Sequence, residues 1–378
     1  MRSTSRAKRM VLRTAALLGA AVLLVASAAP AAAQSPAAGR PSFFKGQVHD
    51  LSGSATSLEK RFESAVKAAD GAFFAAAAFP ASSRIRYGRR DGSDDFYTIS
   101  AGASRIKIRE KRGNGYSISD GDEDERKPGP ALWLLLCDGK TGRMIDPAVL
   151  DPERTYEFDS TPVFWLGNAG AAESLAFLET IFLDHPDIDV REKMLFVLSR
   201  HDDPRVFELL RRTAREDRAG DVRHQAVFWL GTIPDGRAFT GLKEIFRESR
   251  EAGLREQVVF ALSLRKEKEA VVEMIRIARE DGDDSVREKA VFWLGQKASA
   301  ESVKALKDIV SSSTEEDKIK EQAVFAISQL PKDKSVPLLL DIARTHKNPS
   351  VRKKAIFWLG QTDDPAALKL FEEILLKK

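Results

Sequence analysis

The second half of the chain repeats one arrangement of apolar and polar positions about every 32 residues. Residues 286–295 give its fullest form, Val-Arg-Glu-Lys-Ala-Val-Phe-Trp-Leu-Gly. Its apolar side chains at i, i+4, i+7 and i+8 share one face of an α-helix, and further apolar neighbours widen that face to two flanks. A phenylalanine marks the same place in each copy: Phe164, Phe196, Phe228, Phe260, Phe292, Phe325 and Phe357. The pattern predicts a series of similar helices, each covered on both sides.

A second apolar segment follows each of these helices, for example at residues 303–310 and 336–343. Asp-Pro pairs at 203–204 and 364–365 are typical of a helix N-cap followed by the first helical residue. One pair of short helices cannot bury its own apolar faces, whereas stacked pairs bury a continuous core. We therefore expect residues 160–378 to form an α-solenoid of about seven 32-residue helix pairs, starting with a shortened copy at 162–167.

Large and small residues alternate along the predicted stack. Trp-Leu-Gly occurs at residues 165, 229, 293 and 358, and a smaller residue followed by Leu-Ser or Ile-Ser occurs at 197, 261 and 326. Such alternation lets successive layers interdigitate, so we expect the tryptophans to be buried in the core. An aromatic ladder that binds a ligand is the alternative.

A basic residue occupies the second position of each repeated segment: Arg191, Arg223, Arg255, Arg287, Lys320 and Arg352. Stacked helices lie about 10 Å apart, so these cations should form a line. Such a line could bind an acidic peptide or polymer. Acidic residues occur beside them and in the loops, for example Asp221 and Asp284, and we expect ion pairs instead.

The recurring Val-Arg-x-x-Ala-x-x-x-Leu-Gly segment with its second helix resembles HEAT-like repeats of the short bilin-lyase type, and specifically secreted bacterial HEAT-repeat proteins. The resemblance covers residues 160–378. It implies a mainly α fold, a right-handed α-solenoid of HEAT-like helix pairs, with the Val-Arg helices on the concave face and a role in binding or scaffolding. Deoxyhypusine hydroxylases, a related group, hold di-iron through His-Glu pairs, and none of the five histidines here precedes a glutamate. Bilin lyases act in the cytoplasm. That activity does not suit this chain, because its N-terminus predicts export, as described next.

The first 33 residues have the three parts of a secretory signal peptide. Five basic residues and no acidic one begin the segment, an apolar run fills 14–26, and Ala31-Ala-Ala33 precedes Gln34. We expect cleavage before Gln34 and a periplasmic or secreted protein that does not span the membrane afterwards. An uncleaved anchor, which needs about 20 apolar residues, is the alternative.

Residues 34–54, rich in Ala, Gly, Ser and Pro, suggest a flexible linker, and 55–159 suggest a small N-terminal α+β domain. A helix is expected over 57–74, and strands over 96–100, 105–109 and 116–119. A hairpin is expected where Asp138-Gly-Lys-Thr joins the apolar run 131–137 to residues 142–145. We expect this domain to cover the apolar end of the first repeat.

Charge and cysteine content exclude several functions. The chain has 60 Lys and Arg against 56 Asp and Glu, and removal of the basic leader leaves it nearly neutral, so nucleic acid is not an expected partner. Cys137 is the single cysteine, which rules out an internal disulfide and a cysteine zinc site. We expect a buried thiol there, with a reactive nucleophile as the alternative.

No catalytic, metal-binding or cofactor-binding motif occurs in the sequence, and we expect no cofactor. The prediction is a non-enzymatic scaffold that binds a protein or peptide; its oligomeric state is left open. The alternative is an envelope enzyme with its chemistry in residues 75–159 and the solenoid as substrate dock. The predicted contact residues are the polar positions of the Val-Arg helices: Glu192, Lys193, His224, Gln225, Glu256, Gln257, Glu288, Lys289, Glu321, Gln322, Lys353 and Lys354.

Overall fold

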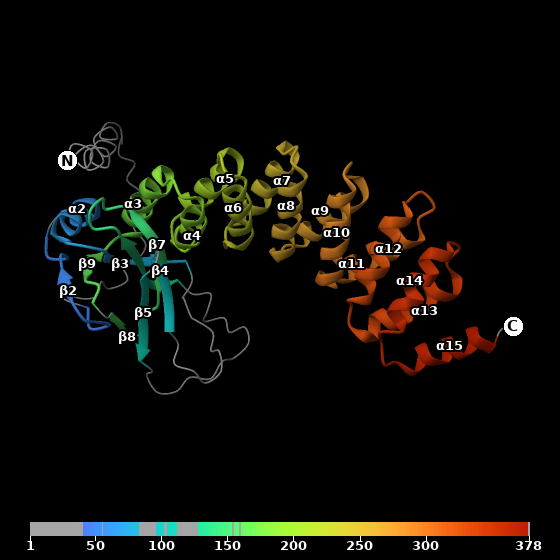
Figure 1. The fold of residues 1–378 in the computed structure, drawn as a ribbon. Coiled ribbons are helices and arrows are strands. Elements are labelled where there is room, and N and C mark those ends of the chain that lie inside the picture. Colours follow the sequence, from blue (N-terminus) through green and yellow to red (C-terminus); the bar gives the residue numbers. More distant parts are fainter. Residues whose placement is uncertain are drawn as a thin grey trace. The chain divides into compact units, whose positions relative to one another are not determined.

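The computed structural model describes residues 41–54, 56–82, 96–101, 104–111, 128–152, 155–158 and 160–376. The proposed signal peptide and the expected strand at 116–119 lie outside these residues. The chain divides into two compact units, residues 1–206 and 207–378. The first contains strands and helices and the second contains helices (Figure 1).

Two β-sheets form the first unit. The four-stranded sheet has the order β1 (Phe44–Lys45), β8 (Thr155–Phe158), β5 (Ser104–Lys111) and β4 (Phe96–Ala101). The five-stranded sheet has the order β2 (Val48–Asp50), β9 (Val163–Asn168), β3 (Phe73–Ala81), β6 (Gly129–Cys137) and β7 (Met144–Leu150). The predicted hairpin is confirmed, because β6 and β7 pair antiparallel around Asp138. The expected strands at 96–100 and 105–109 are confirmed as β4 and β5.

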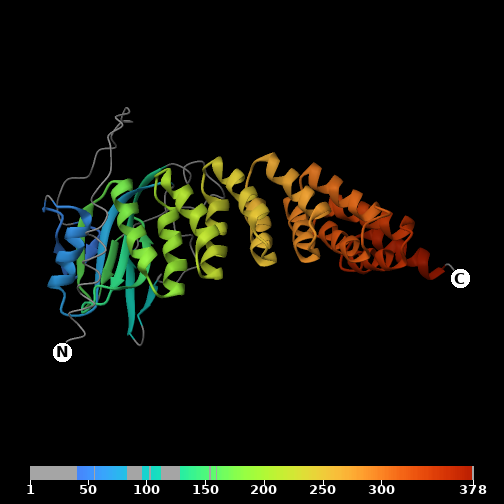
Figure 2. The same ribbon diagram turned by 90° about the horizontal axis from the view of Figure 1, so that it is seen from above.

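The core of this unit lies between the two sheets. Phe44, Tyr156 and Phe158 from the smaller sheet pack against Phe74 and Trp165 from the larger one. Alternate side chains of the larger sheet point the other way, where the helices α2 (Leu58–Ala68), α3 (Ala171–Asp184) and α4 (Ile188–Ser199) contact it. Both faces of the larger sheet are therefore covered, which explains its nearly continuous apolar strands (Figure 2).

Three local predictions for this region were wrong. The segment 162–167, taken as a shortened repeat helix, is the strand β9, whose neighbouring residues Phe164 and Trp165 pack on opposite faces of the sheet. The supposed linker contributes β1 and β2, because the aromatic ring of Phe44 anchors it in the core. The expected helix at 57–74 ends at Ala68, and Phe73 begins β3. The spacing of apolar residues in these segments was compatible with the 3.6-residue period of a helix and with the two-residue period of a strand.

The second unit is a stack of helices that begins in α5 (Arg205–Glu216). The Val-Arg segments form one layer, which we call the Val-Arg layer: α6 (Gly220–Thr232), α8 (Ala252–Leu264), α10 (Asp284–Lys297), α12 (Asp317–Ser328) and α14 (Pro349–Leu359). The outer layer contains α7 (Arg237–Glu248), α9 (Lys268–Glu280), α11 (Ala300–Ser311), α13 (Lys332–Thr345) and α15 (Pro365–Leu376). The predicted solenoid of helix pairs is thus confirmed.

Burial follows the repeated pattern. Val286, Ala290 and Leu294 of α10 are fully buried, as are their equivalents in the other Val-Arg helices. Side-chain caps mark the start of some of these helices. Asp283 accepts a hydrogen bond from the backbone N of Ser285 at the start of α10, and Asn348 accepts one from the backbone N of Ser350 at the start of α14. The apolar stripe is common to all Val-Arg helices, and these caps fix where α10 and α14 begin.

Neighbouring helices of the Val-Arg layer approach one another closely at glycine. A Cβ placed on Gly231 would lie 2.9 Å from Ala261 of the next helix, and one placed on Gly295 would lie 2.7 Å from the carbonyl oxygen of Ala326. Contacts between successive helices are extensive in this layer and sparse in the outer one. A stack that is tighter in one layer curves toward it, so the Val-Arg layer lines the inside of the curve in this unit.

We expect Gly295→Ala to destabilise the second unit by about 1–3 kcal/mol, because the new methyl group meets backbone that cannot move without separating α10 from α12. Gly282→Ala is the control, since a Cβ there has no neighbour within 4 Å, and its change should stay within about 0.5 kcal/mol. Urea unfolding measures both. Equal stability of the two variants would contradict the close approach.

Candidate binding surface

The predicted contact residues all lie on Val-Arg helices, in two groups. Glu192 and Lys193 belong to α4 in the first unit, and the others belong to the Val-Arg layer of the second unit. Lys193 is already engaged, because its Nζ lies 2.7 Å from the Asp146 carboxylate on β7. This ion pair ties α4 to the sheet. The residues of the second unit therefore make up the candidate surface.

Charged residues on this surface pair between adjacent helices. The Glu256 carboxylate on α8 lies 3.7 Å from Nζ of Lys289 on α10, and Glu321 on α12 lies 4.0 Å from Lys354 on α14. Glu288 lies 2.5 Å from Nζ of Lys318 at the start of α12. A glutamate of one helix thus pairs with a lysine of the next at each of these three junctions, and the charges largely compensate one another.

Three arginines of the line of cations at the second repeat position also form ion pairs. Arg223 lies 2.8 Å from Glu251, Arg255 lies 3.1 Å from Asp281, and Arg287 contacts Glu315. Each of these acids precedes the next Val-Arg helix in the stack, so the arginines join successive repeats. The expectation of ion pairs is confirmed for these three arginines, whose main partners are loop acids of the following repeat. Arg352 instead donates to the backbone carbonyl oxygens of His346 and Lys347.

A row of aromatic rings crosses the Val-Arg layer. Its members stack or meet edge to face from helix to helix, with centroids 4.7–6.2 Å apart. In spatial order the row, which we call the aromatic row, contains Trp229, Phe228, Phe260, Trp293, Phe292, Phe325, Trp358 and Phe357. Ala261 and Ala326 stand where the other helices have tryptophan, and they lie against Gly231 and Gly295 of the preceding helices.

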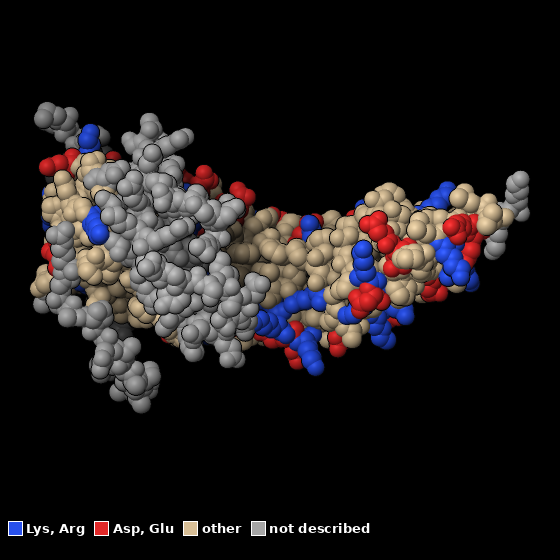
Figure 3. Space-filling model, turned by 90° about the horizontal axis from the view of Figure 1, so that it is seen from below, with Lys and Arg blue, Asp and Glu red and all other residues tan. Residues whose placement is uncertain are grey.

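These rings are less buried than predicted. Trp229, Trp293 and Trp358 are half-buried, and Phe357 is 55% exposed. The expected burial in the core was wrong because the flanks of each helix are covered by its neighbours, whereas no described element covers its inner face. Figure 3 shows a stretch of uncharged surface over the central helices of this unit, with charged groups of both signs beside it.

A buried serine–histidine pair in the first unit was not predicted, because it has no local signature in the sequence. Ser174 Oγ lies 2.8 Å from Nε2 of His201, and it accepts a hydrogen bond of 2.9 Å from the indole of Trp133. His201 Nδ1 lies 3.1 Å from the carbonyl oxygen of Val197. The imidazole therefore donates through Nδ1 and accepts through Nε2. Every polar group is satisfied and both residues are fully buried, so the pair joins sheet and helices without access to substrate.

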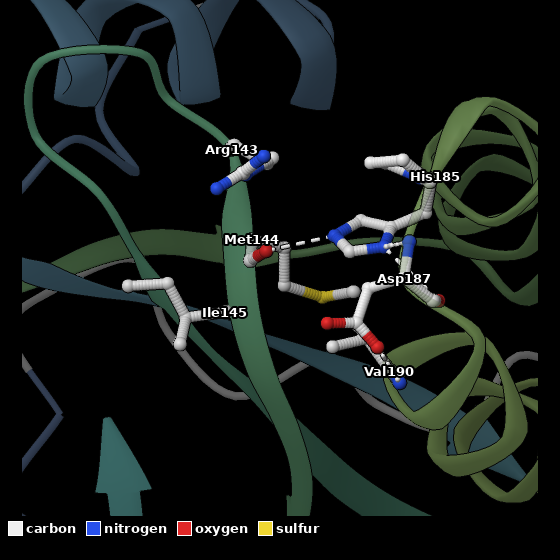
Figure 4. A pocket seen from close by; sticks show the side chains of 7 residues that line it. Arg143, Met144, Ile145, His185, Asp187 and Val190 are labelled. Atoms are coloured by element: carbon white, nitrogen blue, oxygen red, sulfur yellow. Dashed lines mark hydrogen bonds between the residues drawn. The ribbon is translucent and has the colours of Figure 1, made fainter. Parts of the chain in front are cut away.

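A cavity of about 320 Å³ lies beside a second histidine in the first unit. Figure 4 shows the imidazole of His185 pointing toward the β7 backbone, where Nε2 donates to the carbonyl oxygen of Met144 at 2.8 Å. Nδ1 accepts from the backbone N of Asp187 at 3.2 Å. Both ring nitrogens are occupied, so this cavity has no free histidine base.

His346 makes the same two hydrogen bonds as His185, which indicates a structural role for both histidines. Its Nε2 donates to the carbonyl oxygen of Val310 at 2.9 Å, and its Nδ1 accepts from the backbone N of Asn348 at 3.2 Å. In both copies the histidine stands two residues before the N-cap residue of a Val-Arg helix. Both histidines lie in the loop before a Val-Arg helix, and their hydrogen bonds link this loop to the preceding element.

The described residues offer few other groups that could react or bind a metal ion. They contain no group of three or more His, Cys, Asp or Glu placed to hold a metal ion. Cys137 is fully buried, and burial raises the pKa of its thiol, which confirms the expected inert side chain. Among the helices of the described ranges, none is long and apolar enough to cross a membrane.

Comparison with known proteins identifies the repeats as HEAT repeats. A sequence model of HEAT repeats matches residues 175–263, 271–345 and 310–378. Human deoxyhypusine hydroxylase in complex with glycerol is 18% identical, with 54% of this chain and 79% of that chain covered and a TM-score of 0.25. YibA of Escherichia coli is 15% identical, with 55% and 77% covered and a TM-score of 0.33. The search of curated proteins found no match.

The buried imidazole of His201 predicts a loss of stability in acid. Burial lowers its pKa to about 4 in the folded chain, whereas an unfolded histidine has a pKa near 6.5. The unfolded state therefore binds the proton more readily between these values, and stability present above about pH 6.5 falls as the pH drops toward 4. The loss is on the order of 3 kcal/mol.

The control for this prediction is His201→Gln. The variant should be less stable than wild type near neutral pH, because the ring leaves its stacking contact with Phe79, whose centroid is 4.1 Å away. It should lose less stability on acidification. Urea unfolding at several pH values between 7.5 and 4.5 gives the comparison, and parallel curves for the two proteins would assign the acid sensitivity to other groups.

Proposed function

This chain belongs to the HEAT-repeat family, and on that premise we propose that it is a non-enzymatic scaffold that binds another protein through the Val-Arg layer of its second unit. The observation that carries the proposal is the repetition of one partly exposed face on five successive helices, α6 to α14. Each helix contributes the same set: a polar pair, then an aromatic residue. A surface of repeated, similar contacts suits an extended partner.

The polar positions favour a partner of mixed charge. Glu256, Glu288, Glu321 and their lysine partners alternate in sign along the layer. A purely acidic or basic polymer would meet repulsion at every second position. We infer that a protein surface makes several modest polar contacts there, which is typical of the rim of a protein interface.

We further propose that the protein is exported. The basic start, the apolar run and the Ala31-Ala-Ala33 sequence support a cleaved signal peptide. The working location is then the periplasm or the cell exterior, and the partner is an envelope or extracellular protein.

The first test exchanges one ion pair. Glu256→Lys combined with Lys289→Glu keeps the attraction between α8 and α10 and reverses the charge that a partner meets. We expect capture of the partner from an envelope extract of the producing cells to fall at least severalfold, since like charges across an interface are strongly unfavourable. Quantitative mass spectrometry of the captured proteins measures it.

The matched control exchanges a pair in the outer layer, Arg279→Asp with Asp308→Arg. These side chains lie 3.1 Å apart on α9 and α11 and are about equally exposed. Capture should be unchanged, and circular dichroism should show both proteins folded. If the two exchanges affect capture equally, the Val-Arg layer is not the binding surface.

The second test concerns export. The mature protein should begin at Gln34, because Ala31 and Ala33 provide the small side chains that signal peptidase requires. The intact mass of the exported protein gives the answer. A polypeptide that retains Met1 would argue for an uncleaved anchor.

A further inference from the structure

The aromatic row exposes ring surface without hydrogen-bond donors. Trp293 and Trp358 are half-buried as residues, yet their Nε1 atoms are buried. What each indole leaves open is therefore carbon surface. Phe260 stacks on Trp293 with centroids 4.7 Å apart, and Phe357 is 55% exposed at the end of the row. The row is an apolar strip that suits a ligand with flat or compact apolar rings.

The charges beside the row are engaged with each other. Glu256 pairs with Lys289, and Glu321 pairs with Lys354 while also accepting a hydrogen bond from Ser350. A charged ligand would have to compete with these partners, and the compensated charges give it no net attraction. The segment seated on the row is therefore expected to be uncharged, with charged contacts made elsewhere on the partner.

Side-chain amides flank the row on its other side. Gln296 follows Phe292 by four residues on α10, and Gln329 follows Phe325 by the same spacing at the end of α12. Residues four apart share a helix face, and both glutamines are exposed. The amide nitrogen of Gln329 already donates one hydrogen bond to Ser328 Oγ at 3.1 Å. Its second N–H, like the amide of Gln296, can donate to carbonyl oxygens of a ligand that lies along the row.

We propose that the aromatic row binds a proline-rich, uncharged segment of the partner in the polyproline II conformation; this rests on the proposed scaffold function. Prolyl rings supply the compact apolar faces. The backbone of such a segment has no internal hydrogen bonds, so its carbonyl groups are free to accept from the glutamine amides. Aromatic-lined grooves are a general means of recognising this conformation.

The spacing of the stack fits this ligand. A polyproline II helix rises about 3.1 Å per residue with three residues per turn, so it presents the same side about every 9.3 Å. Packed helices lie about 8–10 Å apart. One turn of the ligand therefore matches one Val-Arg helix, and a prolyl ring can meet the phenylalanine that each helix contributes. A neutral sugar polymer would also stack on rings, but it needs polar partners that the ion pairs here already occupy.

Tryptophan emission tests the proposal on the whole mature chain. The probe is a terminally blocked oligoproline of about ten residues, long enough to cross three helices. Trp133 and Trp165 are buried in the first unit, so a change on titration reports the three tryptophans of the row. We expect saturable binding of oligoproline. A blocked Gly-Ser peptide of equal length, an acidic peptide and a neutral glucan oligomer should bind at least tenfold more weakly.

Two substitutions and a control locate the site. Phe357→Ala and Trp293→Leu each remove an aromatic face, and each should weaken oligoproline binding about fivefold, equivalent to ~1 kcal/mol. Val272→Ala on α9 is the control, because Val272 is 61% exposed in the outer layer, and its affinity should equal that of wild type. Thermal unfolding checks that all three proteins are folded. The exposed Phe357 provides a variant with little influence on the fold.

Several outcomes would overturn the proposal. They are no saturable binding of oligoproline, equal affinity in the row variants and wild type, or preference for the glucan or the acidic peptide. Competition separates this inference from the scaffold function. If the partner is captured through the Glu256–Lys289 region but excess oligoproline does not displace it, the scaffold stands and the proline-rich ligand fails. If capture is independent of the Val-Arg layer, the scaffold itself fails.

Discussion

The close packing of successive Val-Arg helices is the constraint on which the second unit depends. A single helix pair leaves apolar flanks exposed, and only the neighbouring pairs cover them. The cover is tight because Gly231 meets Ala261 and Gly295 meets the backbone at Ala326. This approach brings the aromatic rings of neighbouring helices into contact, sets Glu256 opposite Lys289, and places Arg255 within reach of Asp281. Packing, charge compensation and the exposed row therefore have one geometric origin.

Most of the structure of the second unit could be predicted from its sequence, because the same apolar positions that must be buried recur in every repeat. Val286, Ala290 and Leu294 are buried as the spacing predicts. The exposure of the tryptophans could not be read from the pattern. An apolar residue on a helix faces either a neighbour or solvent, and the choice depends on whether a third layer exists. Trp293 lies on the one side where the described chain supplies none.

The first unit was harder to predict, because its decisive contacts join residues far apart in the chain. Trp165 has the sequence context of a repeat helix, yet the edge-to-face rings of Phe43 and Phe44 hold it in a strand. Ser174 and His201 have no local signature and meet only when α3 and α4 pack on the sheet. The signal that was present is the equal spacing of His185 and His346 from the N-cap of the next helix, which marks a structural role.

The alternation of tryptophan and alanine along the Val-Arg layer makes two repeats, and not one, the unit of this solenoid. The helices before and after Trp293 carry a small residue at the same position, Ala261 and Ala326, and these alanines lie against Gly231 and Gly295 of the preceding helices. Loss or duplication of a single repeat would bring two tryptophans, or two alanines, onto adjacent helices. Loss or duplication of two repeats restores the order. Solenoids of this design can therefore change length, in evolution or by engineering, only in steps of two.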